Sequence, residues 1–163
     1  MALTQVQGGM ILASGQSIPK AALPTGSVLQ VVSATSSTIT ITSSTSYVDC
    51  TGITASITPT SATSKILVLI TAAGIYKGTN SGQAVSLRVL RGASEITSQI
   101  NIAYSTTAID FVAETGFVYL DSPATTSSTT YKLQIRARVS GAVQINQDNS
   151  GDISTVTLME IAA

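Results

Sequence analysis

Residues 130–139 read Thr-Tyr-Lys-Leu-Gln-Ile-Arg-Ala-Arg-Val, so apolar and polar side chains alternate with a period of two. In an extended strand this period places successive side chains on opposite faces. One face of the strand then carries Tyr131, Leu133, Ile135, Ala137 and Val139. We predict a strand that lies over a hydrophobic core and turns its Lys, Gln and Arg side chains outward. A solvated outer face is the favoured interpretation, and contact with a ligand is the alternative.

Similar short runs, rich in Val, Ile and Thr, fill the rest of the chain from Ser27 onward. Clusters of Ser and Thr separate them, and no segment has the length, period and caps of a helix. Eleven strand-like runs at this spacing predict an all-β protein, an antiparallel sandwich or a barrel. The other ten runs are Ser27–Val32, Thr38–Thr42, Tyr47–Asp49, Ile53–Thr58, Lys65–Ala73, Ala84–Leu90, Glu95–Ala103, Asp110–Leu120, Ala142–Gln147 and Ser154–Ile161.

Two of these runs are apolar on both faces. In Lys65–Ala73 and Ser154–Ile161, the face opposite the predicted core also carries large apolar side chains. One face of a sandwich strand normally meets solvent, and soluble monomers seldom expose large apolar patches. We therefore expect this second face to be covered, by another subunit in the favoured interpretation or by the chain's own arm or a loop. The residues that we assign to this contact are Leu67, Leu69, Met159 and Ile161.

The first 26 residues follow neither a helical nor a strand period. Gly and Pro interrupt them, and their apolar side chains are isolated. A disordered leader is one interpretation, and an arm that becomes ordered by docking on another subunit is the other. We divide the chain into an extended arm, residues 1–26, and a β-sandwich domain, residues 27–163. The arm's predicted anchors are Val6, Ile11, Ile18 and Leu23.

The composition excludes several classes of function. Eight basic and eight acidic residues leave no net charge, so nothing in it favours binding to nucleic acid or to an anionic membrane. The chain has no His, which removes the commonest catalytic base and zinc ligand. Ser and Thr supply 47 of the 163 residues, so hydroxyl groups must wet much of the surface. The longest apolar stretch spans about half a membrane, and no secretion signal is apparent.

Candidate catalytic groups are few, and we expect no enzyme activity. Ser64 and Lys65 are adjacent, but a Ser-Lys mechanism needs a desolvated Lys beside the hydroxyl. Carboxylate pairs for sugar hydrolysis are the other option, although the chain has no Trp to stack sugars. Cys50 has no partner for an internal disulfide, and Asp49 before it would raise the pKa of its thiol. We interpret Cys50 as a small buried hydrophobe and assign no catalytic residue.

Two further candidates are a calcium site in a turn and a glycan-binding platform of tyrosines. Asp148, Ser150 and Asp152 alternate as calcium ligands do, but the later Glu of a calcium loop is missing. Asn-Ser-Gly-Asp at residues 149–152 also forms a simple hairpin turn, which is the favoured interpretation. The five tyrosines suit either a glycan platform or burial with the hydroxyl at the rim, and burial is favoured. We therefore assign no metal and no cofactor.

Several short motifs resemble a known group of proteins, the C-terminal β-domains of tailed-bacteriophage virion proteins. These include fibre, head-fibre and capsid-decoration proteins of environmental phages, cyanophages among them. The opening residues 1–11 are similar to the start of phage fibre proteins. The motifs are Ser-Tyr-Val-Asp (46–49), Thr-Gly-Ile (51–53), Ser-Ile-Thr-Pro (56–59), Ser-Lys-Ile-Leu-Val (64–68), Asp-Ser-Pro-Ala (121–124), Tyr-Lys-Leu-Gln (131–134) and Thr-Leu-Met-Glu-Ile (157–161).

The resemblance implies a homotrimer with a jelly-roll-like knob and an N-terminal virion anchor. It further implies a virion protein that is assembled in the host cytoplasm, with the major capsid protein or another virion protein as its partner. Because no shaft or coiled coil precedes the predicted knob, we favour capsid decoration or cementing over a long fibre. The alternative is a short tail-fibre or baseplate tip that binds host surface glycan. Both a capsid and a tail location remain open at this point.

Overall fold

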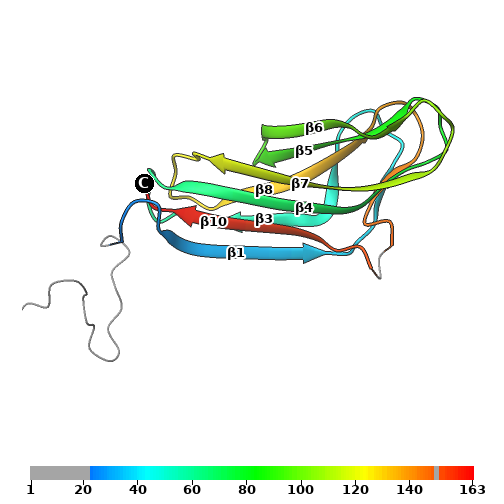
Figure 1. Ribbon diagram of the computed structural model, residues 1–163. Coiled ribbons are helices and arrows are strands. Elements are labelled where there is room, and N and C mark those ends of the chain that lie inside the picture. Colours follow the sequence, from blue (N-terminus) through cyan, green and yellow to red (C-terminus); the bar gives the residue numbers. More distant parts are fainter. Residues whose placement is uncertain (1–22, 149–150) are drawn as a thin grey trace, which may run out of the picture.

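The computed structural model describes residues 23–148 and 151–163 of the chain (Figure 1). These residues form ten β-strands, all paired antiparallel, and no helix. The strands are β1 (Val28–Ser36), β2 (Thr40–Thr42), β3 (Val48–Ile57), β4 (Lys65–Lys77), β5 (Gln83–Arg91), β6 (Ser94–Ser105), β7 (Phe111–Asp121), β8 (Thr129–Ala137), β9 (Val143–Ile145) and β10 (Ser154–Ile161). The predicted all-β class is confirmed.

Two sheets make a jelly-roll-like sandwich. The larger sheet has the order β1-β10-β4-β9-β2, and β7 pairs with the other edge of β4. The smaller sheet has the order β3-β8-β5-β6. Alternate side chains of both sheets meet in the core, for example Ile66, Val68 and Ile70 of β4 and Leu133 and Ile135 of β8, which are almost completely buried. This arrangement pairs neighbouring strands by backbone hydrogen bonds and removes the core-facing apolar side chains from water.

Several strand boundaries differ from the sequence prediction, and β1 continues to Ser36 instead of ending at Val32. The runs Tyr47–Asp49 and Ile53–Thr58 belong to one strand, β3, because Gly52 takes a positive φ of 77° inside it and absorbs an irregularity in the pairing with β8. Strand β4 continues to Lys77, since its last residues pair with both β7 and β9. Val139, which we predicted on the core face, lies beyond the end of β8 and is exposed.

The two ends of the sandwich differ. At the arm end, Gly26 donates a backbone hydrogen bond of 2.8 Å to the carbonyl of Ala162, so the start of the described chain lies beside its C-terminus. The β3–β4 and β7–β8 loops lie at the same end (Figure 1). The distal end carries the β4–β5, β6–β7 and β8–β9 loops. The chain therefore enters and leaves at one end and presents loops at the other.

Candidate interaction surfaces

The outer face of the smaller sheet is polar, as residues 130–139 predicted. From Tyr131 to Ala137, strand β8 alternates between buried and half-buried positions. On its outer side, Lys132 forms an ion pair of 2.9 Å with Asp49, and the guanidinium group of Arg88 lies 4.2 Å from the centre of the Tyr47 ring. Arg88 also pairs with Glu95 at 3.2 Å. Charged groups thus gather on this side of the sandwich, where water solvates them.

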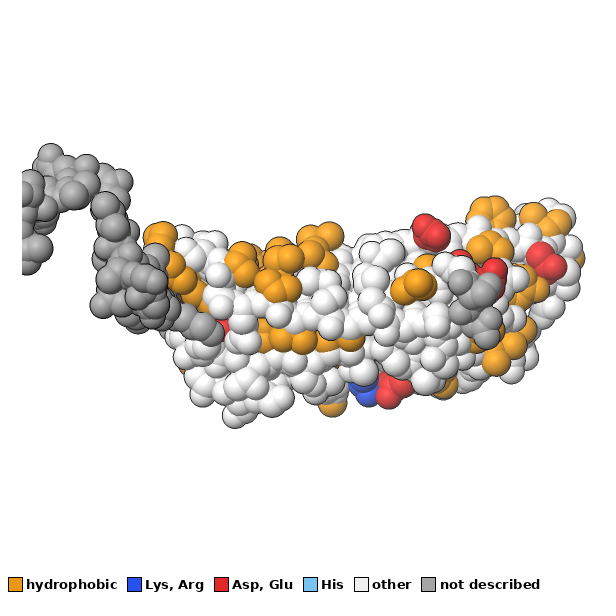
Figure 2. Space-filling view, turned by 90° about the horizontal axis from the view of Figure 1, so that it is seen from below, with side chains coloured by type: hydrophobic (Ala, Val, Ile, Leu, Met, Phe, Trp, Pro, Cys, Tyr) orange, Lys and Arg blue, Asp and Glu red, His pale blue; other side chains and the backbone are white. Residues whose placement is uncertain are grey.

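The outer face of the larger sheet is apolar instead. Across four neighbouring strands, Val31 lies opposite Met159, Met159 opposite Leu67, and Leu67 opposite Leu120. The adjacent row places Leu69 between Thr157 and Val118. We call Val31, Leu67, Leu69, Val118, Leu120 and Met159 the outer apolar face. On one side of the molecule, apolar side chains gather in groups with few charged side chains between them (Figure 2).

The most exposed members of the outer apolar face come from its margins. Val118 is 75% exposed, Leu120 56% and Val31 54%, whereas Leu67, Leu69 and Met159 are half-buried between their neighbours. The outward-facing residues of β4 between Lys65 and Thr71 pair with residues on β10 and β7, and those on β10 pair in turn with residues on β1. Among these residues, Lys65 is the one that is charged. Large exposed apolar patches on soluble proteins are typical of interaction surfaces.

The structure places the four predicted contact residues on this side of the larger sheet. Met159 and Leu67 are direct neighbours, Leu69 lies in the next row, and Ile161 lies opposite Lys65. Their contact with a subunit or with the arm stays a prediction. The sequence analysis missed Val31, Val118 and Leu120. The sequence could have revealed Val118 and Leu120, because they alternate with Phe117 and Tyr119 and so make both faces of this segment apolar.

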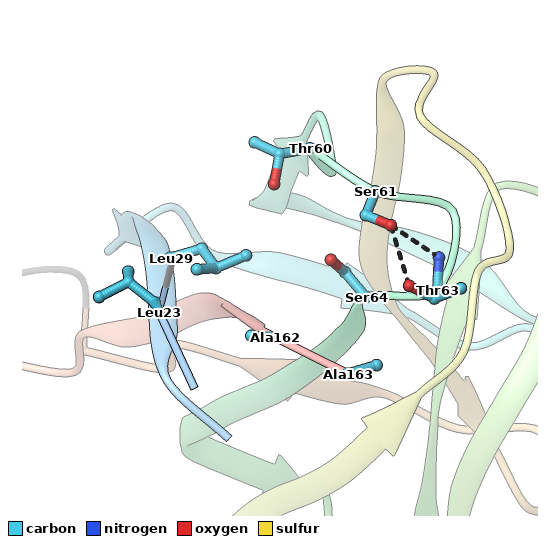
Figure 3. Close-up of a pocket in the computed structure, with 8 residues that line it drawn as sticks. All are labelled: Leu23, Leu29, Thr60, Ser61, Thr63, Ser64, Ala162 and Ala163. Atoms are coloured by element: carbon cyan, nitrogen blue, oxygen red, sulfur yellow. Dashed lines mark hydrogen bonds between the residues drawn. The ribbon is translucent and has the colours of Figure 1, made fainter. Parts of the chain in front are cut away.

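A cavity of about 400 Å³ opens at the arm end (Figure 3). One wall is apolar, formed by Leu23, Leu29 and the C-terminal Ala162 and Ala163, and the other is the hydroxyl-bearing β3–β4 loop with Thr60, Ser61, Thr63 and Ser64. Val28 pairs with Ile161 and Gln30 with Glu160, so Leu29 is the extra residue of a β-bulge. Bulges redirect a side chain, and here the side chain of Leu29 lines the cavity.

Glu160 lies buried behind this cavity and is held by hydrogen bonds. Gln30 Nε2 donates to Oε2 at 2.6 Å, and both the backbone N–H and the hydroxyl of Thr60 donate to Oε1 at 2.7 Å. Burial alone would raise the pKa of Glu160, but these hydrogen bonds and the nearby Ser64 hydroxyl outweigh burial and lower the pKa. The carboxylate therefore fixes the β3–β4 loop against β1 and β10.

The strands and loops of the distal end carry several exposed apolar and aromatic side chains. Tyr104 at the end of β6 is 48% exposed, and the guanidinium group of Arg138 lies 4.8 Å from the centre of its ring. Ile109 of the β6–β7 loop and Phe111 and Val112 at the start of β7 are about half exposed. We call these five residues the distal cluster. An exposed ring beside a guanidinium group suits the binding of a sugar or of another protein.

The candidate catalytic groups are not brought together. Ser64 is buried, whereas Lys65 points to the other side of β4 and donates to the Ser122 hydroxyl at 2.8 Å. Cys50 is buried, and burial together with the neighbouring Asp49 raises the pKa of its thiol, as the sequence predicted. Over residues 23–148 and 151–163, no three His, Cys, Asp or Glu side chains form a group that could hold a metal ion.

Two hydrogen bonds join Asp148 to Asp152. The Asp152 carboxylate accepts a hydrogen bond of 2.8 Å from the backbone N–H of Asp148, and the N–H of Asp152 donates to the carbonyl of Asp148 at 2.7 Å. Residues 149 and 150, which include the middle residue of the proposed calcium pattern, lie outside the described residues, so the hairpin turn at 149–152 stays a prediction.

Of the predicted arm anchors, Leu23 lines the cavity at the arm end, and Val6, Ile11 and Ile18 lie outside the described residues. The division at residue 26 stays a prediction. None of the described residues forms a helix with the length and apolarity that a bilayer crossing requires.

No family model matches the chain, and no curated protein matches it. Solved structures of virus particles do. The structure of infectious bursal disease virus, Gt strain, shares 14% identity at a TM-score of 0.44, over 99% of this chain and 47% of that one. The VP2 subviral particle of the same virus shares 12% identity at a TM-score of 0.41, over 82% and 38%. This chain spans less than half the length of the chains that it matches.

Proposed function

We propose that the protein is a structural virion protein without enzyme activity, which associates with copies of itself through the outer apolar face. The observation that carries this proposal is the contrast between the two outer faces. The outer face of the smaller sheet carries solvated ion pairs. The outer face of the larger sheet exposes Val31, Val118 and Leu120 in neighbouring rows. Full burial of a Val or Leu side chain contributes about 1.5–3 kcal/mol, so covering this face would stabilise an oligomer considerably.

In this proposal the oligomer is a homotrimer that decorates or cements a capsid. The resemblance to phage decoration and fibre domains supports the trimer. Residues 1–26 would attach it to the major capsid protein or to another virion protein. Because the chain enters at one end of the sandwich, the distal loops would point away from the particle. No reaction is required of any residue in this role.

The decisive experiment measures the mass of the purified full chain by light scattering. Three chains of 16.6 kDa give a trimer of about 50 kDa. We expect Val118→Asp to reduce the mass toward that of one chain, because the substitution places a charge in the covered face. Ile100→Asp is the matched control, since Ile100 is also an exposed apolar residue (63%) but lies on β6 of the other sheet. A wild-type monomer, or equal effects of both substitutions, would contradict the proposal.

A second function is favoured by the distal cluster. Its exposed rings lie at the end opposite the arm, where a short tail-fibre or baseplate tip would contact host surface glycan. The same fold could then serve at a tail instead of on a capsid. Binding of the full chain to host cells or to a glycan array, lost in Tyr104→Ala, would favour this function. Binding to capsids stripped of this protein would favour decoration.

A further inference from the structure

The cavity at the arm end contains a buried polar group without a partner. Ser64 is 2% exposed, and its hydroxyl makes no hydrogen bond with any described residue. The hydroxyl lies close enough to Glu160 to contribute to the lowered pKa of that carboxyl, but not in the geometry of a hydrogen bond. Figure 3 shows the hydroxyl directed into the space between the β3–β4 loop and the two leucines. A buried hydroxyl left without a partner is costly, so such groups call for a physical explanation.

The opposite wall of the cavity fits an apolar branch of a ligand. Leu23 and Leu29 face the Ser64 hydroxyl from this wall, and both are only half-buried. The nearby carboxylate of Glu160 already accepts hydrogen bonds from Gln30 and Thr60. None of the side chains that line the cavity is charged, and the terminal carboxylate of Ala163 is the charge in its lining. An extended peptide satisfies this lining, with a branched side chain between the leucines and a backbone amide at Ser64 Oγ.

The cavity also lies beside an unpaired sheet edge. β1 is the last strand of the larger sheet on this side and pairs only with β10 among the described strands. The backbone groups on its free edge can therefore accept another extended segment, which is a common mode of peptide recognition. The peptide would run from the cavity along the start of β1.

We propose that the N-terminal arm of a second copy of this chain occupies the cavity. This inference rests on the self-association proposed above and names a further contact in the oligomer. Residues 1–22 contain one charged side chain, Lys20, and the isolated apolar residues Val6, Ile11 and Ile18, which suit the apolar wall formed by Leu23 and Leu29. Fully extended, 22 residues reach about 70 Å, enough to span to a neighbouring subunit.

The cavity's own arm is a poorer occupant. Leu23 is part of the wall, so the preceding residues start at the mouth of the cavity. To enter the same cavity, the residues before Leu23 would have to turn back toward the wall that Leu23 forms, and Pro19 disfavours a helical turn at Ile18. An arm from a second copy needs no such reversal.

Disulfide trapping in the full chain tests this proposal. Thr63→Cys places a thiol at the exposed rim of the cavity, and Val6→Cys, Ile11→Cys or Ile18→Cys places one on the arm of a second, size-tagged copy expressed in the same cells. Cys50→Ala removes the native thiol from both copies. We expect a disulfide between tagged and untagged chains from at least one arm position. Thr107→Cys, equally exposed in the β6–β7 loop at the distal end, is the matched control and should give none.

Each outcome has a distinct meaning. Oligomers that give no trapped pair, or that trap only within one chain, overturn the arm exchange but leave the proposed function intact. A monomer by light scattering overturns the self-association itself. Ser64→Ala should lower the yield of trapped pairs about fivefold, as expected for one neutral hydrogen bond, without destabilising the fold. If Ser64→Ala leaves the yield unchanged, the hydroxyl does not bind the arm and the proposed binding mode is wrong.

Discussion

Tyr131 of β8 donates a hydrogen bond of 2.7 Å to the carboxylate of Asp121 on β7, and this bond joins the two sheets inside the sandwich. Arg91 of β5 donates to the same carboxylate at 2.9 and 3.0 Å. Burial and the bond to Asp121 both raise the pKa of Tyr131, so the phenol stays protonated and remains a donor. Three strands from two sheets thus meet at one carboxylate.

Tyr131→Phe removes this donor while keeping the buried ring. We expect the free energy of unfolding to fall by about 1–3 kcal/mol, because a buried carboxylate oxygen loses one of its donors. Urea denaturation measures the change. Tyr119→Phe, at a ring that is 37% exposed, is the control and should change stability by less than 0.5 kcal/mol, as is usual for surface sites. Equal losses in both variants would show that Asp121 does not join the sheets.

Glu160 predicts a dependence of stability on pH. Its pKa is lowered from 4.5 in the folded state, so folding favours the charged form. The resulting stabilisation is fully present above about pH 4.5 and is lost as the pH falls through the lower, folded-state pKa.

We expect Glu160→Gln to be less stable than wild type at pH 7 and to lose less stability below pH 4.5. Urea midpoints between pH 7 and pH 3 measure both effects. Glu95→Gln, which removes an exposed carboxylate of a surface ion pair, should keep the acid dependence of the wild type. An unchanged acid slope in Glu160→Gln would refute the assignment.

Alanine substitutions at Gly74 and Gly92 distinguish the effect of backbone strain from that of steric crowding. Both have a positive φ, 54° and 56°, so alanine is strained at either position by about 1–2 kcal/mol. A Cβ at Gly92 would meet nothing within 4 Å, but at Gly74 it would collide with the Asp152 carboxylate and approach the Gln147 nitrogen to 2.7 Å. We expect Gly74→Ala to lower the midpoint of thermal unfolding clearly more than Gly92→Ala. Similar midpoints would mean that the Asp148–Asp152 turn moves aside at no cost.

Deletion of residues 1–22 tests whether the arm attaches the protein to particles. We expect the remaining chain to stay folded and oligomeric, since the outer apolar face is retained, but to lose binding to particles. Sedimentation with stripped capsids measures binding, and light scattering measures the oligomer. The deletion stops before Leu23, because Leu23 lines the cavity and Gly26 already pairs with Ala162. Unfolding of the shortened chain would show that the arm belongs to the folded domain.

The sequence predicted the strand and both of its faces from Tyr131 to Ala137, because strict alternation leaves one arrangement that buries the four apolar side chains of this stretch. The side-chain pattern also predicted the second apolar face of β4 and β10, because Leu67 and Met159 are apolar where a polar residue would continue the alternation. It could not reveal that β7 lies beside β4, which brings Leu120 opposite Leu67. The cavity was also hidden, because the β-bulge at Leu29 and the orphan hydroxyl of Ser64 arise from tertiary packing and not from a local pattern.

The lack of charge on the outer apolar face has a consequence for the conditions under which copies would stay together. Salt screens contacts between exposed charges, but it has little power over contacts made by Val, Leu and Met side chains. Association through this face would persist from dilute buffer to concentrated brine. Because hydrophobic association weakens on cooling, its dissociation should instead be favoured by cold. The stability of an assembly held by this face therefore depends little on ionic strength and strongly on temperature.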